Sequence, residues 1–343
     1  MSIRIAVDAM GGDLGPAVII EGAVSGARTH GASLLLVGDT NAIEAALKAV
    51  EHNDVTLEVV EAPDVITMHD HPAQAVRRKP QSSINVALRL IGEGRADAMI
   101  SAGNSGAVMA ASLMVLGRIK GIERPAIASY VPTVSGKTLL LDLGAVVDPK
   151  PSHMVQFAEM GRVYGERVLN IANPTIGLLS NGEEPTKGNA LVQQVHPLLA
   201  SRDDLNFIGN VEGKDVTMGT VDIVVTDGFT GNVALKTAEG VAAMFTELLR
   251  AEIMTSLSRK IAGVILRPAF RSLRRKLDYA EIGGAPLLGV NGAVIISHGR
   301  SSAKAIESAI SVARRSVEAD LSGGIATAIA NTSSPVDVAQ PAS

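Results

Sequence analysis

The chain has 343 residues, and 46% of them are hydrophobic, which is enough for a sizeable core in one large or two small domains. Its net charge of −4, with no tryptophan and few other aromatic residues, argues against nucleic-acid binding, which needs basic and stacking surfaces. The absence of cysteine excludes disulfides, thiolate nucleophiles and thiolate metal ligands.

The first residues predict a buried strand that runs into a glycine-rich loop. Asp8 interrupts the apolar run, which is therefore too short for a signal peptide, and we expect a cytosolic protein. Pro16 then opens a helix that ends near Gly31, because proline suits the first helical turn. SLLLVG is the next strand, and Thr40 is expected to cap a helix that continues to about His52.

Strands and helices alternate along most of the remaining chain. Further strands are expected near residues 55–60, 96–101, 126–131, 138–142, 175–180, 205–208, 221–226 and 293–297, with helices between most of them. This alternation is typical of a Rossmann-like, doubly wound and mostly parallel sheet. We therefore expect one α/β catalytic domain over residues 1–330 and, from its composition, a disordered tail over residues 331–343.

Five of the expected strands run directly into loops rich in Gly, Asn, Ser and Thr. The segments are IRIAVDAMGGD, ADAMISAGNSGA, TLLLDLGA, TIGLLSNGEEPTKGN and VDIVVTDGFTGN. If the strands are parallel neighbours, their loops open into one crevice, where exposed N–H groups and helix N-termini favour phosphate. The candidate phosphate- and substrate-binding residues are Gly11, Gly12, Asp13, Ser101, Gly103, Asn104, Ser105, Thr226, Asp227, Gly228, Thr230 and Gly231.

Two side chains in these loops are candidates for catalysis. Lys187 follows a strand, where its charge could reach the crevice, although a solvated surface lysine is the plain alternative. Asn232 lies at the start of a long helix, where its amide could donate to a developing oxyanion or merely cap the helix.

Other chemistries have weaker support in the sequence. Neither a P-loop nor a GxGxxG fingerprint occurs, which argues against nucleotide-driven reactions and against hydride transfer. His69, Asp70 and His71 are ligand-type residues without a second cluster, so a turn is favoured and no metal is expected. Ser105 nearly matches a nucleophile elbow, and Asp227 and His298 follow in the order of a serine hydrolase, although Ser105 equally suits a helix N-cap.

The stretch from about residue 240 to 277 contains two successive helical patterns without a strand between them. Residues 250–276 hold eight lysines and arginines and one acid, a local balance of +7, beside apolar residues at helical spacing. This pattern predicts a protruding pair of basic amphipathic helices that contacts an anionic membrane or a partner protein. The alternative is an ordinary solvated helix that packs in a dimer. The candidate contact residues are Leu257, Ile261, Val264, Ile265, Arg271, Arg274 and Arg275.

Several motifs in order give the chain a specific resemblance. DAMGGD, KPQSSI, ISAGNSGA, LDLGA, SNGEEPTKGN, TDGFTGNVALKT and GGAPLLGVNG, spread from Ile3 to about Ala319, resemble those of the acyl-ACP:phosphate acyltransferases, the PlsX family. The resemblance implies a homodimer whose fold is related to phosphotransacetylases and isopropylmalate dehydrogenases. It also implies transfer of a long acyl chain from acyl carrier protein (ACP) to inorganic phosphate, giving acyl phosphate for a membrane glycerol-3-phosphate acyltransferase, without a cofactor.

The resemblance also bears on individual residues. It favours Lys187 and Asn232 over Ser105 as catalytic residues. It also favours direct transfer to phosphate over an acyl-enzyme intermediate, because phosphate is already an anionic nucleophile. Val146 departs from the asparagine usual in the family, which puts any polar contact from that side chain in doubt, and Ser105 replaces a frequent threonine but keeps the hydroxyl. A serine hydrolase and a non-catalytic acyl-carrier-binding protein are the alternative functions.

Overall fold

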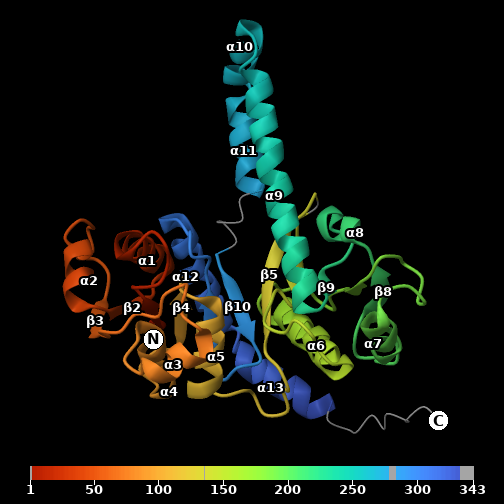
Figure 1. Ribbon diagram of the computed structural model, residues 1–343, viewed down its shortest axis with the longest axis horizontal. Helices are drawn as coiled ribbons and strands as arrows, with labels where there is room; N and C mark the ends of the chain where they lie inside the picture. The colour runs from red at the N-terminus through yellow and green to blue at the C-terminus, as the bar shows by residue number, and fades with distance from the viewer. Residues whose placement is uncertain (1, 135, 278–282, 333–343) are drawn as a thin grey trace.

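A computed structural model describes residues 2–134, 136–277 and 283–332, and of residues 274–277 and 332 it describes the backbone alone. Across these ranges, eleven strands form one sheet in the order β3-β2-β1-β4-β11-β10-β5-β6-β9-β7-β8 (Figure 1). The strands are β1 (Arg4–Asp8), β2 (Ser33–Gly38), β3 (Leu57–Glu61), β4 (Ala98–Ser101), β5 (Ala126–Pro132), β6 (Lys137–Leu141), β7 (Ile176–Leu179), β8 (Phe207–Val211), β9 (Ile223–Val225), β10 (Ala285–Leu288) and β11 (Ala293–Ile296).

Helices cover both faces of this sheet, as expected for a doubly wound fold. They are α1 (Pro16–His30), α2 (Thr40–Leu47), α3 (Pro72–Arg78), α4 (Ser83–Gly92), α5 (Ser105–Val115), α6 (Pro151–Arg167), α7 (Ala190–Ala200), α8 (Gly213–Met218), α9 (Gly228–Ile253), α10 (Leu257–Ile265), α11 (Arg267–Leu277), α12 (Ala303–Glu318) and α13 (Leu321–Thr332). Because side chains alternate along a strand, Ile5 and Val7 pack with α1 and α12, whereas Ala6 packs with α4 and α5 on the other face. The expected α/β class is confirmed.

The sheet consists of two parallel halves that run in opposite directions. Strands β3, β2, β1, β4 and β11 are parallel, and so are β6, β9, β7 and β8. Between the halves, β10 pairs antiparallel with both β11 and β5, and β5 pairs antiparallel with β6, which reverses the second half. The five strands that precede the predicted loops are therefore not all parallel neighbours: β1 and β4 belong to one half, and β6, β9 and β7 to the other.

Three helices, rather than two, break the alternation after β9. Helix α9 begins at Gly228, close to the helix start expected near Asn232, and α10 and α11 fold back along it, so that the three protrude far from the sheet (Figure 1). On α10, Ser256 caps the first turn and all residues of the helix are at least partly exposed. No helix within the described ranges is long and apolar enough to cross a bilayer.

Some local expectations were wrong by a few residues. Asp39, not Thr40, caps α2 by accepting a hydrogen bond from Ala42 N at 2.8 Å, and the helix ends at Leu47. Strand β10 was not predicted, because its four residues follow two glycines and lack a periodic pattern. Helix α13 includes residues 331 and 332, which were assigned to the tail, while residues 333–343 lie outside the described part of the chain.

Candidate active site

A cavity of about 500 Å³ lies between the two halves of the sheet. Ser105, which follows β4, lines one side, and Gly144 and Asn232, which follow β6 and β9, line the other. His298, in the loop after β11, also lines it. Loops from both halves therefore meet in one crevice, although their strands run in opposite directions. Of the five predicted loops, those that follow β4, β6 and β9 contribute lining residues, whereas those that follow β1 and β7 do not.

The first predicted loop is organised by a buried carboxylate. Asp8, at the end of β1, accepts hydrogen bonds from Gly11 N at 3.1 Å and Ser101 Oγ at 2.6 Å, and Ser101 Oγ in turn accepts one from Gly103 N at 3.0 Å. Burial raises the pKa of Asp8, and the hydrogen bond from Ser101 opposes this shift. Ser101 is completely buried, so the structure uses these residues to join the loops after β1 and β4.

The rest of this loop contacts the loop after β11, which lines the cavity. Asp13 N donates to Gly299 O at 2.6 Å, and a Cβ placed on Gly12 would lie 3.2 Å from the same oxygen. Neither Gly12 nor Asp13 belongs to the cavity lining, but residue 299 lies between two residues that do, His298 and Arg300.

A second buried carboxylate organises the loop after β6 in the same way. Asp142 accepts hydrogen bonds from the backbone N–H groups of Ile127, Ala145 and Val146, at 2.9, 3.1 and 2.6 Å. Burial raises its pKa, and these three donors oppose the shift. Val146 O also accepts a hydrogen bond from Gly228 N at 2.9 Å, so position 146 supports the loop through its backbone, which valine supplies as well as asparagine would.

The start of α9 is held against this loop. Asp227 is the N-cap, and its carboxylate accepts from Thr230 N at 2.8 Å and Thr230 Oγ1 at 2.7 Å. The buried Thr226 donates its N–H to Leu141 O at 2.7 Å. A Cβ on Gly231 would overlap the backbone oxygen of Asp142, so only glycine fits there without a shift.

Asn232 is positioned at the cavity by a hydrogen bond to the opposite loop. Its Nδ2 donates to Leu143 O at 3.0 Å, and since Asp227 caps α9, capping is not the role of Asn232. An asparagine amide has two N–H donors. No hydrogen bond within the described residues engages the second donor, and the side chain lines the cavity.

The structure does not join the residues of a serine-hydrolase triad. Asn104, not Ser105, caps α5, and its Nδ2 also donates to the backbone carbonyl of Thr67 at 3.3 Å. Within the described residues no hydrogen bond links Ser105 to His298 or His298 to Asp227; the Nδ1 atom of His298 instead accepts from a backbone N–H, and Asp227 is occupied by the α9 cap.

Lys187 lies apart from the other candidates. It is in the loop that follows β7, and its side chain is exposed. Its backbone N–H donates to the backbone oxygen of Glu184 at 3.0 Å. It does not line the cavity between the halves. Among the residues that the structure describes, no group of three or more His, Cys, Asp or Glu could hold a metal ion, and Asp70 of the HDH segment pairs with Lys79 at 2.8 Å.

Sequence reasoning missed several residues of the cavity. Ser297, at the end of β11, is buried, and no described residue forms a hydrogen bond with its Oγ. Lys236 and Arg300 add two cations, with Lys236 paired to Glu239 at 2.8 Å. A signal was present: the predicted strand at 293–297 runs into the polar loop HGRSS, the same pattern that marked the other five loops.

Comparison with known proteins identifies the family. The sequence pattern described as "Fatty acid synthesis protein" matches residues 3–323. The chain belongs to this family. Proteins named "Phosphate acyltransferase" are 50% identical over 320 residues in Dictyoglomus turgidum, covering 93% of this chain and 95% of that protein, and 51% identical over 317 residues in Geobacter sulfurreducens, covering 92% and 91%. The resemblance drawn from the motifs is confirmed.

Solved structures show that the fold of this family member is shared more widely. The EutD phosphotransacetylase from Staphylococcus aureus superposes with a TM-score of 0.63 at 12% identity, covering 92% of this chain and 94% of that one. A 4-hydroxythreonine-4-phosphate dehydrogenase from Klebsiella pneumoniae superposes with a TM-score of 0.57 at 13% identity, covering 92% and 100%. At these identities the likeness establishes the fold alone.

Proposed function

We propose that this chain, a phosphate acyltransferase of the fatty acid synthesis protein family, transfers a long-chain acyl group from ACP to inorganic phosphate. The observation that carries the proposal is the cavity between the halves, which the amide of Asn232 lines together with two cations, Lys236 and Arg300, and one carboxylate, Glu239, that pairs with Lys236. Both substrates are anionic, so a cavity with this lining suits their approach.

The reaction needs positioning and charge stabilisation rather than a nucleophilic side chain. A phosphate oxygen attacks the thioester carbonyl carbon, the carbonyl oxygen becomes an oxyanion, and collapse of this intermediate breaks the C–S bond to give acyl phosphate and the thiol of ACP. The free N–H of Asn232 donates to the oxyanion, and the hydrogen bond to Leu143 O fixes its direction in advance. Neither the alternative acyl-serine nor a metal enters this scheme.

Lys187 is the second catalytic group in this proposal. Its loop, from Asn181 to Asn189, belongs to the same half of the sheet as Asn232, and its side chain is exposed and forms no ion pair with any described residue. We propose that this loop closes over bound phosphate and brings the ammonium group to the cavity. The glycine-rich loops at residues 11–13, 101–105 and 226–231 hold the other walls in place.

The protrusion supports two further parts of the proposal, a homodimer and a membrane contact. A stripe of apolar side chains on α9, 53–61% exposed, recurs at helical spacing and suits packing against the same helix of a second copy. Beyond it, four apolar side chains of α10 are 56–75% exposed next to basic residues, among them the exposed Arg271. The stripe comprises Val241, Met244, Phe245 and Leu248, and the α10 residues are Leu257, Ile261, Val264 and Ile265. The side chains of Arg274 and Arg275 lie outside the described part.

The membrane contact fits the chemistry of the product. An acyl phosphate with a long apolar tail has reason to leave beside a bilayer, where a membrane glycerol-3-phosphate acyltransferase would use it. Each basic residue near an anionic surface contributes about 1 kcal/mol, and the apolar side chains of α10 can enter the headgroup boundary. We infer a cytoplasmic enzyme that binds the membrane peripherally and reversibly.

Phosphate dependence tests the reaction. Purified protein incubated with acyl-ACP should consume thioester only when phosphate is added, and should yield hydroxylamine-reactive acyl phosphate and free ACP without nucleotide or metal. Equal loss of thioester in phosphate-free buffer would identify a hydrolase instead. Binding of acyl-ACP without any turnover would identify a carrier-binding protein.

Liposome binding tests the membrane contact. Replacing both Ile261 and Ile265 by Asp should abolish co-sedimentation with anionic liposomes and leave turnover in solution largely intact. The control is Ile208→Asp, since Ile208 is 48% exposed on the edge strand β8, outside the protruding helices (Figure 1). Unchanged liposome binding by the double variant would show that the α10 face is covered by protein.

A further inference from the structure

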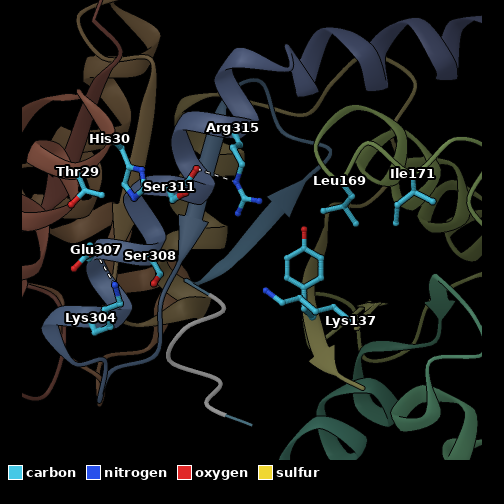
Figure 2. A pocket seen from close by; sticks show the side chains of 11 residues that line it. Thr29, His30, Lys137, Leu169, Ile171, Lys304, Glu307, Ser308, Ser311 and Arg315 are labelled. Atoms are coloured by element: carbon cyan, nitrogen blue, oxygen red, sulfur yellow. Dashed lines mark hydrogen bonds and ion pairs between the residues drawn. The ribbon is translucent and has the colours of Figure 1, made fainter. Parts of the chain in front are cut away.

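A second cavity, of about 480 Å³, lies on the other side of the connection between the two halves (Figure 2). It shares no lining residue with the candidate active site. Strand β5 separates the two: Ser129 lines the first cavity, while its neighbour Tyr130 lines the second, because successive side chains point to opposite faces of a strand. Helix α12 likewise gives Ala305 to the first cavity and Lys304 to the second.

The lining of the second cavity is positively charged, whereas the whole chain carries a net charge of −4. Lys137, Lys304 and Arg315 supply three positive charges against one carboxylate, Glu307. Glu307 is already engaged, because it accepts hydrogen bonds from Lys304 at 2.8 Å and from the hydroxyl of Ser25 at 3.0 Å.

Two of the cations have no anionic partner in the described residues. Arg315 makes one long hydrogen bond, from Nε to Ser311 O at 3.4 Å, and no ion pair involves it. Lys137 lies with its Nζ 5.6 Å from the centroid of the Tyr130 ring, within the range of a cation–π contact, which directs its charge toward the cavity. Figure 2 shows Lys137 and Arg315 pointing into the space between α12 and the second half.

The positive field of this cavity also acts on His30, which lines it. Desolvation lowers the pKa of His30; the charges of Arg314, outside the lining, and of Arg315 and Lys304 also lower it, while the charge of Glu307 opposes them. The far wall is apolar, formed by Leu169 and Ile171, as Figure 2 shows. The volume is within the range of small-molecule sites, which lies at about 300–1,000 Å³.

We propose that this cavity binds a small organic phosphate. Its phosphate group accepts hydrogen bonds from Lys137 and Arg315, and its organic body packs against Tyr130, Leu169 and Ile171. Guanidinium and ammonium donors are the usual partners of phosphate. Because the apolar wall contacts the organic body, an organic phosphate should bind more tightly than inorganic phosphate. The site is separate from the one that holds the phosphate substrate.

Ribose 5-phosphate is a suitable probe because it does not absorb where tyrosine does. The chain has no tryptophan and three tyrosines, of which Tyr130 lines the cavity, so binding there should change the total tyrosine fluorescence. The intact protein should bind ribose 5-phosphate, with a fluorescence change, more tightly than inorganic phosphate, and should not bind ribose. Binding should weaken at least about tenfold in Arg315→Met and in Lys137→Met, as expected for the loss of a charged hydrogen bond.

A charge-matched variant separates the two cavities. Lys236→Met also removes one positive charge, but from the candidate active site, so it should leave ribose 5-phosphate binding unchanged. Arg315→Met should keep acyl transfer in the absence of the probe, since Arg315 is remote from the reacting groups. Three results would each overturn the proposal: no binding to the unaltered protein, binding by Arg315→Met and Lys137→Met as tight as that of the unaltered protein, or loss of binding in Lys236→Met.

Discussion

The contact between α9 and the loop after β6 makes a sharp prediction about two glycines of one helix. At Gly231 an added Cβ would overlap the backbone oxygen of Asp142 and lie 2.8 Å from Thr226 Cγ2, whereas ordinary contacts are 3.4–4 Å. At Gly240, on the same helix, an added Cβ would meet nothing within 4 Å. Alanine should therefore have opposite effects at the two positions.

The magnitudes follow from two opposing effects. In a helix, alanine is more stable than glycine by about 0.5–1 kcal/mol, so Gly240→Ala should raise the free energy of unfolding by that amount. Overpacking costs about 1–3 kcal/mol, and here the obstacle is backbone that cannot rotate away. With the upper part of that range, about 2–3 kcal/mol, Gly231→Ala should lower the free energy of unfolding by about 1–2.5 kcal/mol after the helical gain is subtracted.

Urea unfolding of both variants, with turnover measured in parallel, checks this reasoning. Displacement at Asp142 also moves the neighbouring Leu143 carbonyl that holds Asn232, so Gly231→Ala should reduce kcat while Gly240→Ala should not. If the two variants had the same unfolding midpoint and slope, the close approach at Gly231 would not be present in the folded protein. A destabilised but fully active Gly231→Ala would instead separate this contact from catalysis.

The remaining predictions concern the catalytic groups and a surface carboxylate. Asn232→Ala and Lys187→Ala should each lower kcat by about 10²–10³ without unfolding the protein, the usual effect of losing a preorganised oxyanion donor, whereas Ser105→Ala should have a smaller effect because no acyl-serine forms. Steady-state kinetics of the three variants measure these effects, and a larger loss of kcat in Ser105→Ala than in the other two variants would instead identify Ser105 as the nucleophile. The hydrogen bond from Lys79 lowers the pKa of Asp70 to about 2, so an NMR titration should show its midpoint there, and Lys79→Met should move it toward the ordinary value of about 4. Since the folded pKa is the lower one, the stabilisation by ionised Asp70 should be complete above about pH 4 and be lost as pH falls toward 2.

The strand-and-loop pattern predicted where the loops around the cavity lie, because the hydrogen bonds that shape them are local. Asp8, Asp142 and Asp227 each lie at or just after the end of a buried strand and accept backbone N–H groups from the next few residues. Asn104 and Ser105 show the limit of such reasoning. Both residue types can cap a helix, so the sequence alone leaves the cap uncertain by one position.

The relative direction of the two halves could not be predicted from local patterns. It depends on β10 and β5, whose antiparallel pairing joins residues far apart in the chain, such as Leu287 with Ile127. Strand β10 has four residues after two glycines, too few for a period to appear. The strand order is also set by long-range pairing: β7 lies one strand further from β6 than β9 does, so the sequence did not show that Lys187, which follows β7, lies outside the cavity that Asn232 lines.

The construction from two halves has a consequence for catalysis. Asn232 is hydrogen-bonded to Leu143 within the second half, whereas Ser105 and His298 belong to loops of the first half. The distance from Asn232 to Ser105 and His298 therefore depends on how the two halves are held together. Strand β5 is part of that connection, and its two faces form walls of both cavities. A ligand on the Tyr130 side would therefore lie against the same strand that places Ser129 in the wall of the candidate active site, so a change in that strand is a physical route by which the second cavity can affect the first.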